Sequence, residues 1–222
     1  GTIPDLTNWS KLKHIQLNSN PLLTGTVPSS LSSCSNMEVI QISGCQLHGS
    51  LDYFLDSNIQ TKLRVIDLAQ NGFSGTLSPS LFDFPELESL VLACNCFEGT
   101  IPSRICKAHK LKYLVIDGLS LGAECHQSTF SQPNWFGFDA NIPLSSFNGL
   151  LPSCAYSLPS LKGLHASGNF ITGQLVDIPS SSSLTSIELG NNVFTGSIPT
   201  NMMNIGARRE DGTVYNTLGL SY

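Results

Sequence analysis

A glycine motif that recurs at a nearly constant spacing constrains the fold of this chain more than any other feature. The form Gly-x-(Ile/Val/Leu)-Pro, or a near match to it, begins at Gly1, Gly25, Gly49, Gly75, Gly99, Gly149, Gly173 and Gly196. The intervals are 23 to 26 residues, except for the 50 residues between Gly99 and Gly149. A period of roughly 20–29 residues predicts a solenoid, in which each repeat buries its apolar face only against its neighbours.

A second pattern, L-x-x-L-x-L-x-x-N, precedes the glycine motifs. It occurs seven times, beginning at Leu12, Met37, Leu63, Leu87, Leu111, Leu161 and Leu184. Successive side chains of an extended chain point to opposite faces, so the leucine-type residues of this pattern face the core and the residues between them face solvent. Each repeat is therefore expected to supply one short strand to a parallel sheet, followed by a return segment of no more than a turn or two of helix.

The full consensus, L-x-x-L-x-L-x-x-N-x-(F/L)-x-G-x-(I/L/V)-P, is clearest from Leu87 to Pro102 and from Leu184 to Pro199. It resembles the plant-specific class of leucine-rich repeats found in receptor-like kinases, receptor-like proteins, polygalacturonase inhibitors and similar repeat proteins of algae and protists. The resemblance implies an α/β fold: a right-handed leucine-rich-repeat solenoid with a parallel β-sheet on its concave face and short helical or extended return segments. Residues 1–222 are expected to be a single fragment of such a solenoid, with about seven repeats and a partial one.

The resemblance implies ligand binding by the concave or lateral face. In the family the ligands are peptides, steroids, glycans or other proteins. The exposed strand positions and their neighbours, here called the concave face, are His14, Gln16, Asn18, Gln41, Asp67, Val91, Tyr113, Val115, Asp117, His165 and Glu188. A rigid sheet holds such side chains in rows about 4.8 Å apart, so little entropy is lost when a partner docks. We therefore expect a non-catalytic recognition module for a protein, peptide or glycan ligand; the alternative is a structural or adhesive repeat protein without a defined soluble ligand.

The asparagine that closes each repeat is predicted to be buried at the turn after the strand. Its amide can satisfy backbone N–H and C=O groups that the sheet leaves unpaired, so stacked asparagines would form a ladder. Asn71 and Asn95 occupy this position in consecutive repeats, whereas Gln70, one residue earlier, is expected to face outward. Cys45 replaces the asparagine in one repeat, which the motif allows, and Leu119 replaces it in another.

The repeat that contains Leu119 is followed by the long interval. Its excess over the usual 24 residues is 50 minus 24, or 26, and places an island insertion at about residues 123–148. The aromatic residues of this island are Phe130, Trp135, Phe136, Phe138 and Phe147. Island insertions in plant receptor ectodomains resemble this arrangement and can form part of a ligand site, since long ordered loops are often functional. The alternative is that these aromatic side chains pack over the ladder where it is disturbed at Leu119.

The chain contains seven cysteines, an odd number that leaves at least one of them free. Cys125 stands at the start of the island and Cys154 just past its return, so the two are predicted to form a disulfide that fixes the insertion to the repeats. Asn8, in Asn8-Trp9-Ser10, is a glycosylation acceptor by sequence. Both features favour an extracellular or cell-surface location.

Charge and hydropathy exclude two classes of partner. The chain has 11 Lys and Arg residues against 16 Asp and Glu residues, with no basic cluster larger than Arg208-Arg209, so nucleic acid is not an expected partner. No apolar run approaches the roughly 20 residues that cross a bilayer. Membrane attachment is therefore expected only through segments absent from this fragment, which starts without Met at a motif that recurs downstream.

One segment matches a catalytic motif. Gly118-Leu119-Ser120-Leu121-Gly122 fits the G-x-S-x-G nucleophile elbow, and Asp139 and His165 would complete the order Ser, Asp, His. The elbow requires a helix directly after the serine, however, and no helical periodicity follows Ser120. We therefore expect no enzymatic activity and no cofactor.

A zinc site is also considered, because Cys94, Cys96, Cys106 and His109 are residues of the types that bind zinc. The repeat geometry separates the first two from the last two across the core of the coil. The five histidines are scattered over separate repeats and form no paired set. The sequence therefore predicts no metal site.

Overall fold

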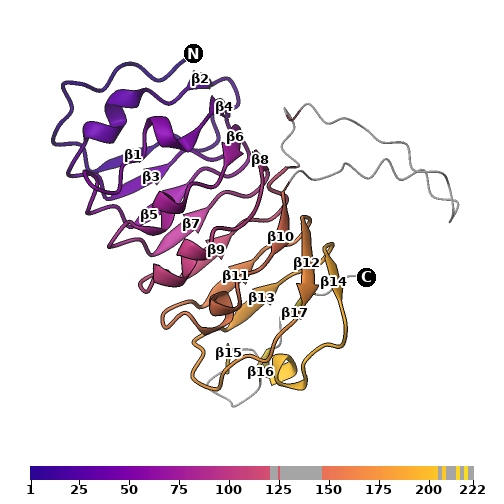
Figure 1. The fold of residues 1–222 in the computed structure, drawn as a ribbon. Helices are drawn as coiled ribbons and strands as arrows, with labels where there is room; N and C mark the ends of the chain where they lie inside the picture. The colour runs from indigo at the N-terminus through magenta and orange to yellow at the C-terminus, as the bar shows by residue number, and fades with distance from the viewer. Residues whose placement is uncertain (121–124, 126–146, 205–206, 209–213, 216–217, 220–222) are drawn as a thin grey trace, which may run out of the picture.

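The computed structural model describes residues 1–120, 125, 147–204, 207–208, 214–215 and 218–219. They form one curved stack of coils that runs from the N-terminal to the C-terminal end (Figure 1). Each complete coil contributes a strand to an inner sheet, a second strand at the side of the stack, and a return segment. Within the described part of the chain, no helix is both long and apolar enough to cross a membrane.

The inner sheet has eight strands, and its pairs are parallel. In spatial order these are β1 (His14–Gln16), β3 (Val39–Gln41), β5 (Val65–Asp67), β7 (Ser89–Val91), β9 (Tyr113–Val115), β11 (Gly163–His165), β13 (Ser186–Glu188) and β17 (Leu218–Gly219). The first seven coincide with the predicted strands. The central residue of each is buried, as at Ile40, Ile66 and Leu90, because it faces the core, and this confirms the predicted register.

A second series of strands, which the sequence patterns did not predict, lies along one side of the stack and is here called the lateral sheet (Figure 1). Its first part consists of β2 (Thr24–Thr26), β4 (Gln46–Gly49), β6 (Gly72–Thr76) and β8 (Cys96–Glu98). Its second part consists of β10 (Asn148–Leu150), β12 (Phe170–Gln174) and β14 (Val193–Thr195). The repeated glycine lies in or beside these strands with a positive φ. Gly149, for example, has φ +86°, and a Cβ there would lie 2.7 Å from Thr100 Cγ2.

The return segments carry 3₁₀-helices rather than α-helices. They are η1 (Ser29–Ser33), η2 (Leu51–Tyr53), η3 (Pro79–Phe82), η4 (Ser103–Lys107), η5 (Ser153–Ser157) and η6 (Thr200–Asn204). Pro28, Pro102 and Pro152 directly precede η1, η4 and η5, where their fixed φ leads from the extended chain into the first turn. The chain ends in a short antiparallel pair, β15 (Ala207–Arg208) and β16 (Val214–Tyr215), besides β17.

The predicted asparagine ladder is present between the two sheets. Asn95 is fully buried; its Nδ2 donates to the carbonyls of Leu68 (3.0 Å) and Leu92 (2.8 Å), and its Oδ1 accepts from the N–H of Phe73 (3.0 Å). Asn71 makes the equivalent bonds one coil earlier. These amides therefore satisfy backbone groups of their own coil and of the preceding one, as expected for buried polar groups.

Gln70 is exposed and has φ +55°, as the turn before the ladder residue requires. Cys94 adopts the same left-handed conformation before Asn95. The side chain of Gln70 thus faces outward, as predicted, while the next residue faces the core.

The chain continues the ladder across the island. Leu119 is buried and has no amide to contribute, but Asn169 of the next coil donates to the carbonyl of Ile116 (2.9 Å) and accepts from the N–H of Leu119 (3.0 Å). Residues 53 positions apart are therefore joined as if they belonged to consecutive repeats.

Both ends of the island are anchored on β8 and on the residue that follows it. At the start, the N–H of Phe97 donates to the carbonyl of Leu119 (2.7 Å), and the hydroxyl of Ser120 donates to the carbonyl of Phe97. At the return, Phe147 pairs with Gly99 and is fully buried, and the N–H of Asn148 donates to the carbonyl of Gly99 (2.7 Å). The repeat is thus resumed at Phe147, just inside the predicted boundary.

The predicted disulfide between Cys125 and Cys154 is wrong. Cys125 bonds to Cys96, and Cys154 bonds to Cys106. Ser120, at the start of the island, bonds to β8, and Cys125 then lies beside Cys96 of that strand. Cys154 lies in η5, which packs against η4, and η4 contains Cys106. Cys34, Cys45 and Cys94 are free.

Candidate functional site

The exposed side of the inner sheet consists of three rows of side chains, which run across the strands. The first row is His14, Val39, Val65, Ser89, Tyr113, Gly163 and Ser186; the second is Gln16, Gln41, Asp67, Val91, Val115, His165 and Glu188. The third, just past the strands, is Asn18, Ser43, Ala69, Ala93, Asp117, Ser167 and Gly190. The predicted concave-face residues are all exposed or half-buried, so they do point away from the core. Their contact with a ligand stays a prediction.

The N-terminal end of the concave face is polar, with its amides bonded to one another. Gln16 Nε2 donates to Gln41 Oε1 (2.6 Å), and Asn18 Oδ1 accepts from the N–H of Ser43 (3.0 Å). His14 is exposed and lies 3.7 Å from a carboxylate oxygen of Glu38. These groups satisfy each other without any strong concentration of charge.

The centre of the concave face is rich in valine, although Ser89 and Asp67 also lie in its rows. Val39, Val65, Val91 and Val115 are half-buried, and alanines occupy the third row beside two of these strands. Such a surface offers apolar contact area along four neighbouring strands, which an extended segment lying across them could cover.

Tyr113 borders this centre and is 47% exposed. Its ring lies over Gly163 of the next strand, where a Cβ would be only 3.0 Å from Tyr113 Cδ1. Gly163 therefore leaves the space that the aromatic ring occupies. The sequence patterns identified Tyr113 but missed Gly163, whose only signal is a glycine at a strand position where other repeats carry a side chain.

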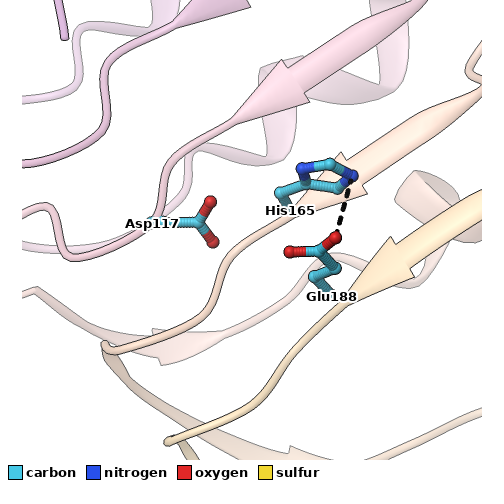
Figure 2. A group of neighbouring side chains, drawn as sticks. All are labelled: Asp117, His165 and Glu188. Atoms are coloured by element: carbon cyan, nitrogen blue, oxygen red, sulfur yellow. Dashed lines mark ion pairs between the residues drawn. The ribbon is translucent and has the colours of Figure 1, made fainter. Parts of the chain in front are cut away.

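At the C-terminal end, three titratable side chains from neighbouring strands converge (Figure 2). They are Asp117 just after β9, His165 at the end of β11 and Glu188 at the end of β13. One potential ligand atom from each lies within 4.8 Å of the other two, and all three residues are half-buried. His165 Nε2 is 3.9 Å from Glu188 Oε1 and 2.9 Å from Ser186 Oγ. The imidazole and carboxylate groups are of types that bind divalent metal ions.

The environment of Asp117 affects its ionisation. Burial raises the pKa of its carboxyl above the usual range, while the N–H of Ser167, which donates to Oδ1 at 2.6 Å, opposes that shift. The thiol of Cys94 also has a raised pKa, first because of burial and second because of the negative charge of Asp117. Asp117 is therefore a half-buried acid that influences its neighbours.

A ladder of charges follows the edge of the inner sheet where the strands begin. Lys13 pairs with Glu38 (2.9 Å), and Glu88 pairs with both Arg64 (3.3 Å) and Lys112 (2.9 Å). Hydrogen bonds from Lys112 and Arg64 lower the pKa of Glu88. Each of these pairs joins adjacent coils.

The structure shows other roles for residues of the two alternative chemical sites. Ser120 is buried, and its hydroxyl donates to the carbonyl of Phe97, whereas Asp139 lies outside the described residues. Cys96 and Cys106 belong to two different disulfides, so neither is available as a thiolate ligand.

Two further predictions concern the glycosylation acceptor and the aromatic residues of the island. Asn8 is exposed in a turn near the N-terminus, where a glycan would have room, and its glycosylation stays a prediction. The island aromatics Phe130, Trp135, Phe136 and Phe138 lie outside the described residues.

Comparison with known proteins agrees with this architecture. The Leucine Rich Repeat family matches at residues 11–34, 62–84 and 86–108. Receptor-like protein 41 of Arabidopsis thaliana is 34% identical over 146 residues, which are 64% of this chain and 16% of that protein. Receptor-like protein 39 of the same plant is 32% identical over 203 residues, covering 78% of this chain and 22% of that protein. This chain thus spans about a fifth or less of the length of these relatives.

Among solved structures, the Arabidopsis receptor kinase HAESA, in complex with the peptide hormone IDA and the co-receptor SERK1, superposes with a TM-score of 0.73. The match is 22% identical and covers 99% of this chain and 31% of that one. At this identity the likeness concerns the fold.

Proposed function

Since this chain belongs to the leucine-rich-repeat proteins and is related to plant receptor-like proteins, we propose that it is a non-catalytic recognition module whose concave face binds an extended protein or peptide segment. The observation that carries the proposal is the order of side chains on this face: an apolar centre between a polar N-terminal end and a titratable C-terminal end. A segment could bury apolar side chains at the centre and place polar ones at either end.

The dimensions of the face favour such a ligand. The four valines of the centre lie on β3, β5, β7 and β9, which at a spacing of about 4.8 Å gives a span of about 14 Å. An extended peptide rises about 3.3 Å per residue, so about four residues would cross it. The related fold of HAESA has been solved with a peptide hormone, which makes a peptide a reasonable ligand class for a solenoid of this shape.

Rigidity supports recognition by this surface. The strands are joined to one another and to the asparagine ladder, so the exposed side chains are held in place before a partner arrives and little entropy is lost on binding. Two disulfides on either side of the island add further constraint. Because disulfides persist in oxidising compartments, they also favour a position outside the cell or on its surface.

A random heptapeptide library displayed on phage tests the proposal. We expect enrichment of peptides that bind the wild-type chain, and at least a tenfold loss of their affinity in Val115→Lys, because a charge at the apolar centre must be desolvated when a peptide covers it. Ser103→Lys adds the same charge on η4 and should leave affinity unchanged, since Ser103 is exposed on a return segment. Thermal unfolding of both variants establishes that they are folded.

Two outcomes would contradict the proposal. Peptides that bind both variants equally would place the binding surface elsewhere. A failure to enrich any peptide, together with concentration-dependent self-association in sedimentation, would favour a structural or adhesive repeat protein.

A further inference from the structure

We propose that Asp117, His165 and Glu188 form a binding site for a divalent metal ion of the zinc class at the C-terminal end of the concave face (Figure 2). The inference does not depend on the proposed peptide ligand. It rests on the placement of the three side chains, on their chemistry and on the ion pairs of the described residues, none of which joins a lysine or an arginine to Asp117 or Glu188.

The fold brings the three residues together from distant parts of the sequence. β9, β11 and β13 are neighbours in the inner sheet, and His165 is in register with Glu188 on one side and Val115 on the other. Asp117 stands two residues beyond Val115, where the chain leaves β9. Because the strands belong to a rigid parallel sheet, the three side chains are held on one surface whether or not a metal is present.

The donor set suits zinc better than magnesium or calcium. One imidazole nitrogen and two carboxylate oxygens are ligands that zinc accepts, and a water molecule can complete a four-coordinate site. Magnesium and calcium prefer a larger number of oxygen ligands. The neutral form of His165 would be the metal ligand, and with two carboxylates the three ligand groups would contribute a formal charge of −2 to the bound ion.

No basic side chain among the described residues forms an ion pair with Asp117, and Glu188 is paired only with His165. Glu88 of the charge ladder differs from these two carboxylates, because it pairs with both Arg64 and Lys112. Two half-buried carboxylates close to each other repel, and a divalent cation relieves that repulsion.

The separation of the ligand atoms requires a local adjustment, in which His165 Nε2 gives up its hydrogen bond with Ser186 Oγ. Ligands of a tetrahedral zinc ion are about 3.4 Å apart, given bonds of about 2.1 Å. In the structure the His165 to Glu188 distance is 3.9 Å, and the full set lies within 4.8 Å. The Glu188 side chain is 43% exposed, so it has room to move the remaining ångström or so towards the other two.

Other repeats supply conservative replacements for all three residues. Asn18 occupies the position of Asp117 and accepts the same hydrogen bond, from the N–H of the third-row residue on the next coil, and Gln16 and Gln41 occupy the row of His165 and Glu188. Asp117→Asn, His165→Gln and Glu188→Gln should therefore fold like the wild type while removing the ligand group or its charge.

Calorimetric titration of zinc chloride into the tag-free chain, in a buffer that does not chelate metals, tests the site. We expect saturable binding of one ion by the wild type, and at least a tenfold weaker affinity in each of the three variants, because loss of even an outer-shell group costs about 10–100-fold. Magnesium chloride at the same concentrations should give no comparable binding. Unfolding without metal should be the same in wild type and variants.

Two matched controls identify the ligands. Asp67→Asn removes an acid from the row of His165 and Glu188, on β5. Cys94→Ser removes a free thiol whose pKa is raised by burial and by the charge of Asp117. Both variants should bind zinc like the wild type. The proposal is overturned if the wild type shows no one-site binding, if fewer than two of the three ligand variants lose affinity, if either control loses it, or if magnesium binds as tightly as zinc.

Discussion

The inner sheet and the lateral sheet respond differently to the island. The pairing of the inner sheet is continuous across the island, because β9 pairs with β11 in the same register as the neighbouring pair β7 and β9. The lateral sheet is divided there: β8 and β10 belong to separate sheets, and only the bridge between Gly99 and Phe147 joins them. Both disulfides lie near this division.

The difference shows where a repeat protein can accept an insertion. The inner strands carry the proposed binding surface and the apolar core residues, so a gap between them would expose core and displace the concave face. The lateral strands are short edge elements, and the chain leaves the stack after Ser120, which bonds to β8, and returns at Phe147 beside Gly99. Covalent links and single hydrogen bonds then replace the missing sheet contacts.

The largest effect is expected from removing the disulfide that spans the division. The loop closed by Cys106 and Cys154 has a sequence separation of 48 residues, so the double variant Cys106→Ser/Cys154→Ser should lose about 4 kcal/mol of unfolding free energy in the chain-entropy treatment. Denaturant titration under non-reducing conditions measures it. Cys94→Ser, which changes a free thiol, should lose less than about 1 kcal/mol.

Peptide mapping of the unreduced chain provides a separate test of the same region. Cross-linked peptides should contain Cys96 with Cys125, and Cys106 with Cys154. A recovered link between Cys125 and Cys154 would mean that the island is anchored to the return segments rather than to β8.

The next largest effect is expected at the last asparagine of the ladder before the island. Asn95→Leu should reduce the unfolding free energy by about 3 kcal/mol, because the N–H of Phe73 and the carbonyl of Leu92 would be left buried without their partner. Asn71→Leu should behave similarly. Gln70→Leu is the control, since Gln70 is exposed, and should change stability by only about 0.5 kcal/mol. Equal losses at positions 70 and 71 would show that the repeat register is wrong.

A smaller effect should distinguish the division from an ordinary junction of the lateral sheet. Gly149→Ala should cost about 2 kcal/mol, because alanine is strained at φ +86° and its Cβ would clash with Thr100 across the division. Gly75→Ala has a similar φ of +91° but no atom within 4 Å of the new Cβ, so it should cost about 1 kcal/mol. Thermal unfolding of both variants measures the difference. Identical losses would indicate that the coil after the island does not pack closely on Thr100.

The smallest effect concerns the inner sheet, through the charge ladder at its edge. The pKa of Glu88 is lowered in the folded state, so its pairing contributes stability above the usual glutamate pKa of 4.5, and that contribution is lost as the pH falls through the folded value. Glu88→Gln should therefore be about 0.5 kcal/mol less stable than the wild type at pH 7, since solvent screens the pair. The difference should shrink as the pH is lowered below 4.5. A difference that does not change with pH would assign the effect to packing rather than to charge.

The sequence by itself determined the elements that every repeat shares. The alternation around Ile40 and Ile66 fixed which side of each inner strand is buried, since neighbouring side chains of a strand must face opposite ways. The position of Asn95 after the strand indicated a buried amide for the same reason. These features are local, and repetition made them recognisable.

Only the tertiary structure decided the features that depend on contacts between coils. The pairing of Cys125 with Cys96 follows from the route of the chain at Ser120, which bonds to β8, and no local pattern encodes that route. The sequence placed His165 and Glu188 in one row, but Asp117 joins them only because the island is excluded from the inner sheet and β9 meets β11. Local periodicity sets the direction of each side chain, whereas the stacking of coils sets its neighbours.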